Sequence, residues 1–251
     1  MNIFGRVTIG LLWIVGAIPM TANTIWTDGT FGNAGPLPDT AQMIWGDNQS
    51  LDAIFGNLPD ANSSAMFRIL ITDPANFSAN VYPDPFDPTS QVIPQIFLFD
   101  STGAAISGGI GAFVGNAALP FGPDTPGYYY LMVNSVGLNP IFTATAPDGT
   151  QTQQPLFCQD LSYDSSALVP CAGVGAQTIA GYQGQGTYNG GTTGTDPYVS
   201  GAYAVLLTGV TAPAPVPEPG TVFLLLSGAI LVLAGKKRLS AGRTEKTIAV
   251  K

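Results

Sequence analysis

Short runs of apolar and β-branched residues, separated by proline, glycine and aspartate, dominate the central part of this chain. In Met66–Ile71 the alternation predicts a strand that buries Phe67 and Ile69 on one face and exposes Arg68 on the other. No segment between residues 23 and 210 repeats its apolar residues with the 3.6-residue period of an amphipathic helix. We therefore predict an all-β fold, an antiparallel jelly-roll-like β-sandwich.

Other runs show the same enrichment in β-branched and aromatic residues. Strands are predicted over Gln95–Phe99, Tyr128–Val133 and Gly201–Val210. The residues Asp100–Gly103 form a typical turn with glycine in its last position, so a return strand is expected from Ala104 onward.

The distribution of charge excludes several classes of function. The chain has a net charge of −8 and no histidine, and between residues 23 and 212 Arg68 stands against fourteen aspartates, a formal charge of −13. Nucleic-acid affinity depends on cationic side chains, and histidine is the commonest general base. We therefore expect no nucleic-acid partner and no enzymatic activity. A small carbohydrate-active enzyme that uses two aspartates is an alternative.

Both ends of the chain differ from its acidic middle. Arg6, the apolar run Val7–Ile18 and the sequence Pro19–Ala22 are typical of a secretory signal. We predict a signal peptide over residues 1–22 with a short helix, removed by signal peptidase, and an N-terminal segment over 23–46. An uncleaved membrane anchor is the alternative.

Near the other end, a proline-rich stretch, a short apolar run and a basic cluster follow one another. They are the linker 211–216, the motif Val216, Pro217, Glu218 and Pro219, the apolar run Thr221–Ala234, and the cluster Lys236, Lys237 and Arg238, followed by a tail over 239–251. The apolar run is shorter than the about 20 residues of a spanning helix, and the cations after it favour the cytoplasmic side. In this layout residues 217–238 closely resemble the PEP-CTERM sorting signal.

That resemblance implies export by a Gram-negative bacterium that makes extracellular polysaccharide. The short hydrophobic helix is expected to hold the chain transiently in the inner membrane until an exosortase-type enzyme processes it. The protein is then expected at the outer surface or in the extracellular matrix, with a binding or structural role toward polysaccharide. The alternative is a binding module that stays anchored in the inner membrane and works in the periplasm.

A second resemblance covers residues 47–210. The segments that carry it, in chain order, are Ile54–Asp60, Met66–Ile71, Asp73–Ser78, Gln95–Gly103, Pro126–Leu131 and Gly201–Gly209. They are similar to the bacterial pre-peptidase C-terminal (PPC) domain, a jelly-roll-like β-sandwich that is non-catalytic and in some members binds calcium or fibrous polymers. A glycine-rich insertion over about 134–200 interrupts the match. This insertion has few strand-like runs. Its glycine- and tyrosine-rich stretch Gly181–Tyr198 is interpreted as a tolerated surface loop, with binding of planar or sugar ligands as the alternative.

Two residue sets are candidates for site chemistry. Cys158 and Cys171 are the only cysteines, and an even pair in an exported chain predicts a disulfide. The carboxylates of Asp84, Asp87 and Asp100 are the best oxygen ligands for calcium, although aspartates beside prolines also serve turns. No other cofactor is expected. Arg68 is expected to pair with an aspartate across the strands.

Overall fold

The computed structural model describes most of the central chain. The described residues are 24–29, 33–60, 62–90, 92–111, 116–159, 166–172, 174, 177–183 and 200–215. The predicted signal peptide, the sorting signal with its basic cluster, and the tail lie outside these residues, as do residues 184–199 of the glycine-rich insertion.

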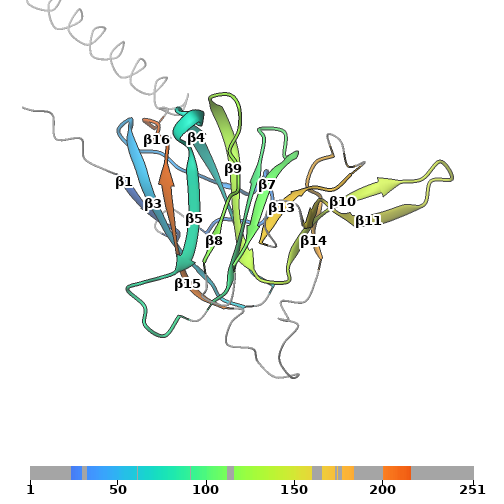
Figure 1. Ribbon diagram of the computed structural model, residues 1–251, viewed down its shortest axis with the longest axis horizontal. Coiled ribbons are helices and arrows are strands. Elements are labelled where there is room, and N and C mark those ends of the chain that lie inside the picture. Colours follow the sequence, from blue (N-terminus) through green and yellow to red (C-terminus); the bar gives the residue numbers. More distant parts are fainter. Residues whose placement is uncertain are drawn as a thin grey trace, which may run out of the picture.

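The described chain is all-β, with one short 3-10 turn as its helical element (Figure 1). The elements are β1 (Thr24–Thr27), β2 (Gln42–Met43), β3 (Gln49–Leu58), β4 (Ser64–Ile71), η1 (Pro74–Asn76), β5 (Ser78–Pro83), β6 (Pro94–Phe99), β7 (Ala105–Ile110), β8 (Ala117–Ala118), β9 (Gly127–Ser135), β10 (Asn139–Thr145), β11 (Gln151–Pro155), β12 (Phe157–Gln159), β13 (Ala167–Pro170), β14 (Gly181–Gln183), β15 (Gly201–Thr208) and β16 (Val210–Ala212). No helix in this part of the chain has the length and apolar content that crossing a membrane requires.

The strands form one large sheet and one small sheet. The large sheet has the order β12-β13-β7-β6-β9-β4-β16-β3-β15-β5-β8, with β1 beside β3 and β2 beside β4, and the small sheet has the order β11-β10-β14. All pairings are antiparallel except β1 with β3 and β2 with β4. The large sheet is curled, which brings β7 close to β8 at the far end of the strand order. A Cβ at Gly109 of β7 would lie 2.8 Å from the carbonyl carbon of Ala118 in β8.

The all-β, mainly antiparallel class predicted from the sequence is confirmed. The predicted strands at 66–71, 95–99 and 128–133 lie within β4, β6 and β9. Within β4, Phe67, Ile69 and Ile71 are buried and Arg68 is partly exposed, as the alternation predicts.

The last predicted strand, Gly201–Val210, is two strands that meet at Gly209. β15 pairs with β3 and β5, whereas β16 pairs with β3 and β4. Gly209 has φ of +72°, a left-handed conformation that glycine adopts without a steric penalty. Its carbonyl accepts the N–H groups of Thr72 (2.9 Å) and Asp73 (3.1 Å). Gly209 is therefore the corner at which the chain changes its strand partners.

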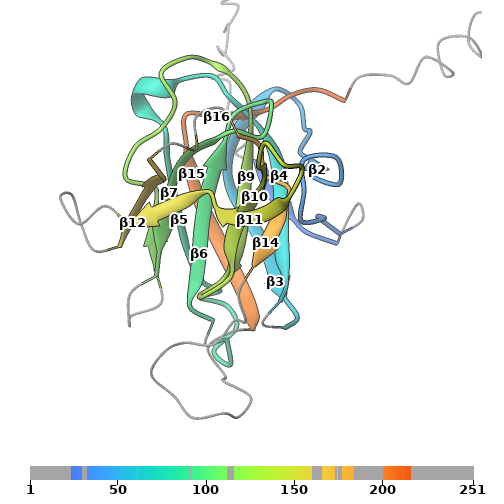
Figure 2. The same cartoon turned by 90° about the vertical axis from the view of Figure 1, so that its right-hand side faces the viewer.

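The insertion contains more strand structure than its sequence suggests. The strands β10 to β14 form between residues 139 and 183, whereas most of the Gly-Tyr stretch interpreted as a surface loop lies outside the described residues. Figure 2 shows several of these strands in front of β6 and β9. The inserted side chains of Phe142, Leu156 and Phe157 pack with Phe97 and Phe99 of β6 in a second apolar core.

This second core explains why β6 is buried along its whole length. Ile96 and Leu98 face the main core, whereas Phe97 and Phe99 face the insertion. Phe157 lies 5.0 Å from Phe97 between ring centroids, in a tilted arrangement. A strand covered on both faces has a continuous apolar sequence rather than an alternating one.

The predicted disulfide between Cys158 and Cys171 is confirmed. It joins β12 to the residue that follows β13, with the two Cα atoms 4.9 Å apart. A loop of this length, closed covalently, stabilises a fold by about 3 kcal/mol, mainly by restricting the unfolded chain. The bond therefore holds the strands that cover the second core.

Candidate functional site

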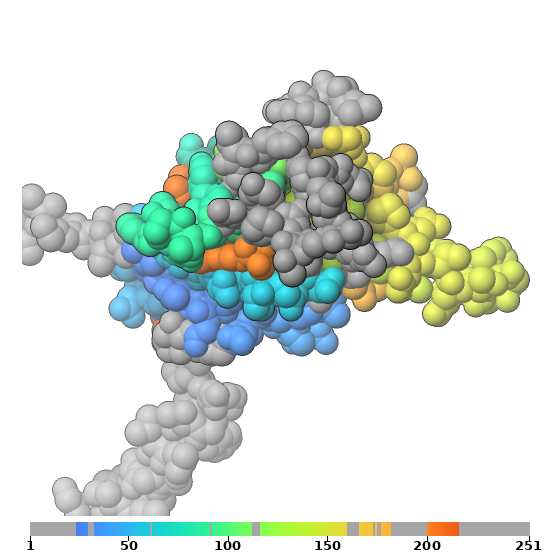
Figure 3. All heavy atoms as spheres, turned by 90° about the horizontal axis from the view of Figure 1, so that it is seen from below, coloured from blue at the N-terminus to red at the C-terminus, as the bar shows by residue number. Residues whose placement is uncertain are grey.

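An apolar groove of about 820 Å³ lies on the outer face of β1, β3, β15 and β5, beside the loop that follows β5. Figure 3 shows this loop in green next to the orange strand β15. The residues that line the groove are Ile25, Asp52, Ala53, Phe55, Tyr82, Pro83, Asp84, Pro85, Phe86, Asp87, Pro88, Ser90, Ala204 and Leu206. We call this set the apolar groove.

Strand alternation brings apolar side chains to the surface here. In β15, Tyr203, Val205 and Leu207 point into the main core, so the residues between them, Ala204 and Leu206, point outward. Leu206 is 49% exposed, and Ile25 of β1 is 63% exposed. Several exposed apolar side chains that adjoin one another on a soluble domain mark an interaction surface.

The loop after β5 is fixed in place and presents an aromatic ring. The N–H of Asp84 donates to the carbonyl of Ala202 (2.9 Å), and Ser90 Oγ donates to the same carbonyl (2.6 Å). Between these two anchors Phe86 is 81% exposed, and its ring centroid lies 6.0 Å from that of Phe55. The groove therefore has a preformed aromatic wall.

Two of the three predicted calcium ligands lie in this loop, where both carboxylates accept turn hydrogen bonds. Asp84 Oδ1 accepts the N–H of Phe86 (2.9 Å), and Asp87 Oδ1 accepts the N–H of Thr89 (2.9 Å). The hydrogen bond from the Thr89 side chain, followed by that from its N–H, lowers the pKa of Asp87 below its ordinary value. The carboxylates of Asp84 and Asp87 form an acidic rim of the groove together with Asp52.

The third predicted ligand, Asp100, lies elsewhere. It follows β6, whereas the loop with Asp84 and Asp87 precedes that strand, so the structure does not bring the three together. Asp100 Oδ1 accepts the N–H groups of Thr102 (2.8 Å) and Ala104 (2.9 Å). Partial burial opposes its ionisation, but hydrogen bonds from Thr102, Ala104 and Gly103 outweigh burial and lower its pKa. Among the described residues, no three His, Cys, Asp or Glu side chains are grouped to hold a metal ion.

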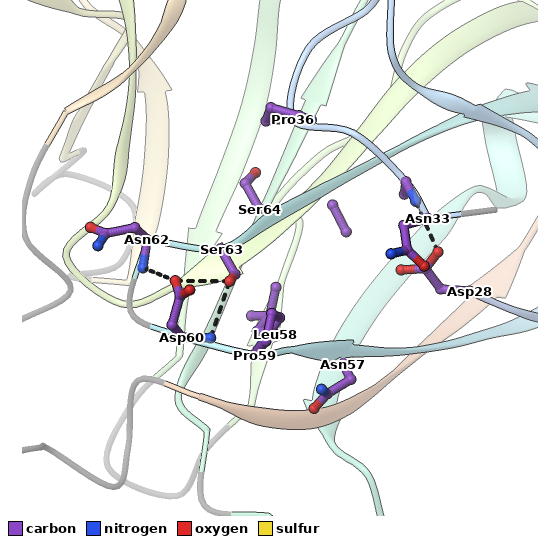
Figure 4. Close-up of a pocket in the computed structure, with 12 residues that line it drawn as sticks. Asp28, Asn33, Pro36, Asn57, Leu58, Pro59, Asp60, Asn62, Ser63 and Ser64 are labelled. Carbon is purple, nitrogen blue, oxygen red and sulfur yellow. Dashed lines mark hydrogen bonds between the residues drawn. The ribbon is translucent and has the colours of Figure 1, made fainter.

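A second hollow, a polar pocket of about 570 Å³, lies between the loop after β1 and the β3–β4 turn (Figure 4). Its two carboxylates are already used within the loops. Asp28 Oδ1 accepts the N–H of Ala34 (2.9 Å), and Asp60 Oδ1 accepts the N–H of Asn62 (2.8 Å) and the Ser63 hydroxyl (2.9 Å). These bonds give the pocket walls a structural role in shaping the two loops.

One buried polar side chain, Tyr203 of β15, lies opposite Gly56 of β3. The ring of Tyr203 packs on Gly56, its partner across β3 and β15, where a Cβ would collide with the ring. Complete burial, and to a smaller extent the charge of Asp28, raises the pKa of Tyr203 well above its ordinary value. The phenol therefore stays neutral and acts as a core side chain.

Arg68 contacts an aromatic ring, a partner that the sequence did not predict. Its guanidinium lies over the ring of Tyr128, 4.3 Å from the centroid. Tyr128 is diagonal to Arg68 on the neighbouring strand β9, where Tyr130 is the direct partner. An aspartate was the expected partner, whereas the signal for this contact is the run of three consecutive tyrosines that β9 places alongside β4.

The sequence located the groove only in part. Asp84 and Asp87 were named as candidates, but Phe86 between them, Phe55, Ile25 and Leu206 were not. A usable signal was present, because β15 carries aliphatic residues at consecutive positions and one set must face outward.

No protein-family model and no curated protein sequence matches the chain. The fold and the groove define an all-β protein with a preformed apolar and acidic surface site.

Proposed function

We propose that this chain is an exported, non-catalytic cell-surface or matrix protein that binds extracellular polysaccharide in the apolar groove. The observation that carries the proposal is the exposed Phe86 ring, held beside Phe55 and an acidic rim. The protein body is proposed to be a jelly-roll-like β-sandwich related to the PPC domain. The curled antiparallel sheet agrees with that architecture.

The chemistry of the groove suits a sugar chain. A pyranose ring has an apolar C–H face, which packs on an aromatic ring, and hydroxyl groups at its edge, which donate to carboxylates. Phe86 and Phe55 supply the aromatic surface, and Asp52, Asp84 and Asp87 supply acceptors. The formal charge of −13 between residues 23 and 212 repels anionic polymers, so the proposed ligand is a neutral or amino-sugar polysaccharide.

Calcium binding in this loop stays a prediction. A calcium ion takes six to eight oxygen ligands. Asp84 and Asp87 supply two carboxylates that already accept hydrogen bonds from the loop.

Replacing Phe86 with alanine is expected to weaken polysaccharide binding at least tenfold without lowering the melting temperature, because the side chain is largely exposed. The probes are cello-hexaose and chitosan hexamer, with oligogalacturonate as the anionic comparison, and the measurement is titration calorimetry on the purified full chain. Phe121→Ala is the matched control, since Phe121 is 44% exposed and lies outside the groove. Equal affinity of the Phe86 variant and the parent, or tighter binding of oligogalacturonate, would contradict the proposed site.

The route to the surface is proposed from the two ends of the chain. Signal peptidase is expected to remove residues 1–22, and an exosortase-type enzyme to cut near Val216–Pro219. Mass spectrometry of the protein from outer-membrane and extracellular fractions is expected to show a chain that ends near Pro217–Pro219. A chain that retains Lys236, Lys237 and Arg238 in the inner membrane would instead support the periplasmic binding module.

A further inference from the structure

The hairpin of β10 and β11 projects from the body as an arm, drawn in yellow-green in Figure 1 and in yellow in Figure 3. All five residues of β11 are exposed, so neither face of this strand is covered. The proximal half of β10 is buried at Ile141 and Phe142, whereas Thr143 to Thr145 are not. An isolated two-stranded hairpin is only marginally stable in water. The distal arm therefore has the structure of an element that a partner covers.

The hydrogen-bond pattern shows which backbone groups of the arm are open. The N–H of Ala146 donates to the carbonyl of Thr150 (2.8 Å), and the N–H of Leu156 donates to the carbonyl of Pro140 (2.9 Å). Because bonded and non-bonded pairs alternate in an antiparallel ladder, the backbone groups of Gln151 and Gln153 point away from β10. The backbone of Pro155 also points away from β10. A strand tolerates proline at such a position, because no N–H is needed there for pairing with β10.

The open edge lacks the usual protection against pairing. Edge strands are commonly guarded by charged side chains, bulges or central prolines. Residues 151–154 are Gln, Thr, Gln and Gln, with no charge among them, and Pro155 stands only at the end of the strand. A neutral, extended edge of this kind is suited to strand addition.

We propose that β11 pairs antiparallel with β11 of a second copy of this chain. Pairing centred on Gln153 places identical neutral side chains about a twofold axis and aligns open N–H groups with open carbonyls. The distribution of charge favours contact between two copies at their arms rather than at their bodies. The formal charge between residues 23 and 212 is −13, and the arm from 139 to 155 carries Asp148 alone, at its turn. Contact through the arms joins two copies while their acidic bodies stay apart.

The test is site-directed crosslinking of the full chain. Twofold pairing centred on Gln153 brings the two Cα atoms to about 5.5 Å, within disulfide range. Gln153→Cys is therefore expected to give a covalent dimer under mild oxidation, at least ten times faster than Thr145→Cys, which is also exposed but lies on β10. Adding excess unlabelled Gln153→Lys chain is expected to leave the crosslinking rate unchanged, because a lysine on the edge prevents mixed pairing.

A second measurement does not depend on cysteines. Sedimentation of the parent chain is expected to show a dimer at micromolar concentration, and Gln153→Pro is expected to give a monomer, since it removes an outward N–H without breaking a bond to β10. Equal crosslinking at positions 153 and 145, or a parent chain that is monomeric at 100 μM (about the upper end of such measurements), would overturn the proposal. Crosslinking of Gln153→Cys to a different protein would also overturn it, because the partner would then not be a second copy.

Discussion

Replacing Gly209 with alanine is expected to lower the free energy of unfolding by about 4 kcal/mol. A side chain in the left-handed region costs about 1–2 kcal/mol. The second contribution is steric, because a Cβ at this position would collide with the carbonyl oxygen of Asp73 and lie 3.0 Å from Phe77 Cα. Both neighbours are backbone atoms, which cannot move aside as the end of a flexible side chain can.

The matched control for this variant is Gly149→Ala. Gly149 has φ of +83°, close to that of Gly209, but a Cβ there would meet no atom within 4 Å. Urea unfolding of both variants therefore separates the backbone strain from the collision, and only the strain of about 1 kcal/mol is expected at position 149. Equal losses at the two positions would mean that crowding at the β15–β16 corner contributes nothing.

Replacing Phe97 with alanine is expected to cost about 4 kcal/mol. The side chain is fully buried, contacts Phe157 of the insertion, and would leave a large cavity in the second core. Because Phe97 contacts the insertion, this variant tests whether the insertion packs on β6 as part of the fold. If residues 139–183 were only a surface loop, Phe97 would be solvent-exposed and its removal would cost little.

Phe121→Ala is the control for Phe97→Ala, since Phe121 is an aromatic residue with 44% exposure. A loss below 1 kcal/mol is expected there, measured by the same urea titration. A similarly small loss for Phe97→Ala would show that the insertion does not pack on β6.

Local patterns explain which strands could be predicted. β4 has a clear alternation, and β9 has a dense run of aromatic and β-branched residues, so both were found within a few residues. The short parallel partners β1 and β2 were missed, because two to four residues contain too little pattern and their pairing depends on distant strands. The strands of the insertion were not predicted for a similar reason: β11 has a polar sequence, and β12 to β14 are three or four residues long.

Local sequence patterns could likewise predict only part of the candidate site. Aspartates between prolines are visible in a sequence, so Asp84 and Asp87 were named. The groove, however, forms where β1, β3, β15 and the loop after β5 come together, and residues as distant as Ile25 and Leu206 share it. Such a surface depends on the order of strands in the sheet, which no local pattern contains.

The position of β16 has a consequence for the time at which this protein can fold. β16 lies between β3 and β4, so the last of the described strands to be made is an interior strand of the sheet, and its two neighbours are among the first made. During synthesis the emerging chain keeps a gap in the middle of its sheet until residue 212 has been added. Contacts this distant in sequence form slowly, because a long loop must close before they form. The sheet therefore reaches its full set of strand pairings only after residues 210–212 have been made.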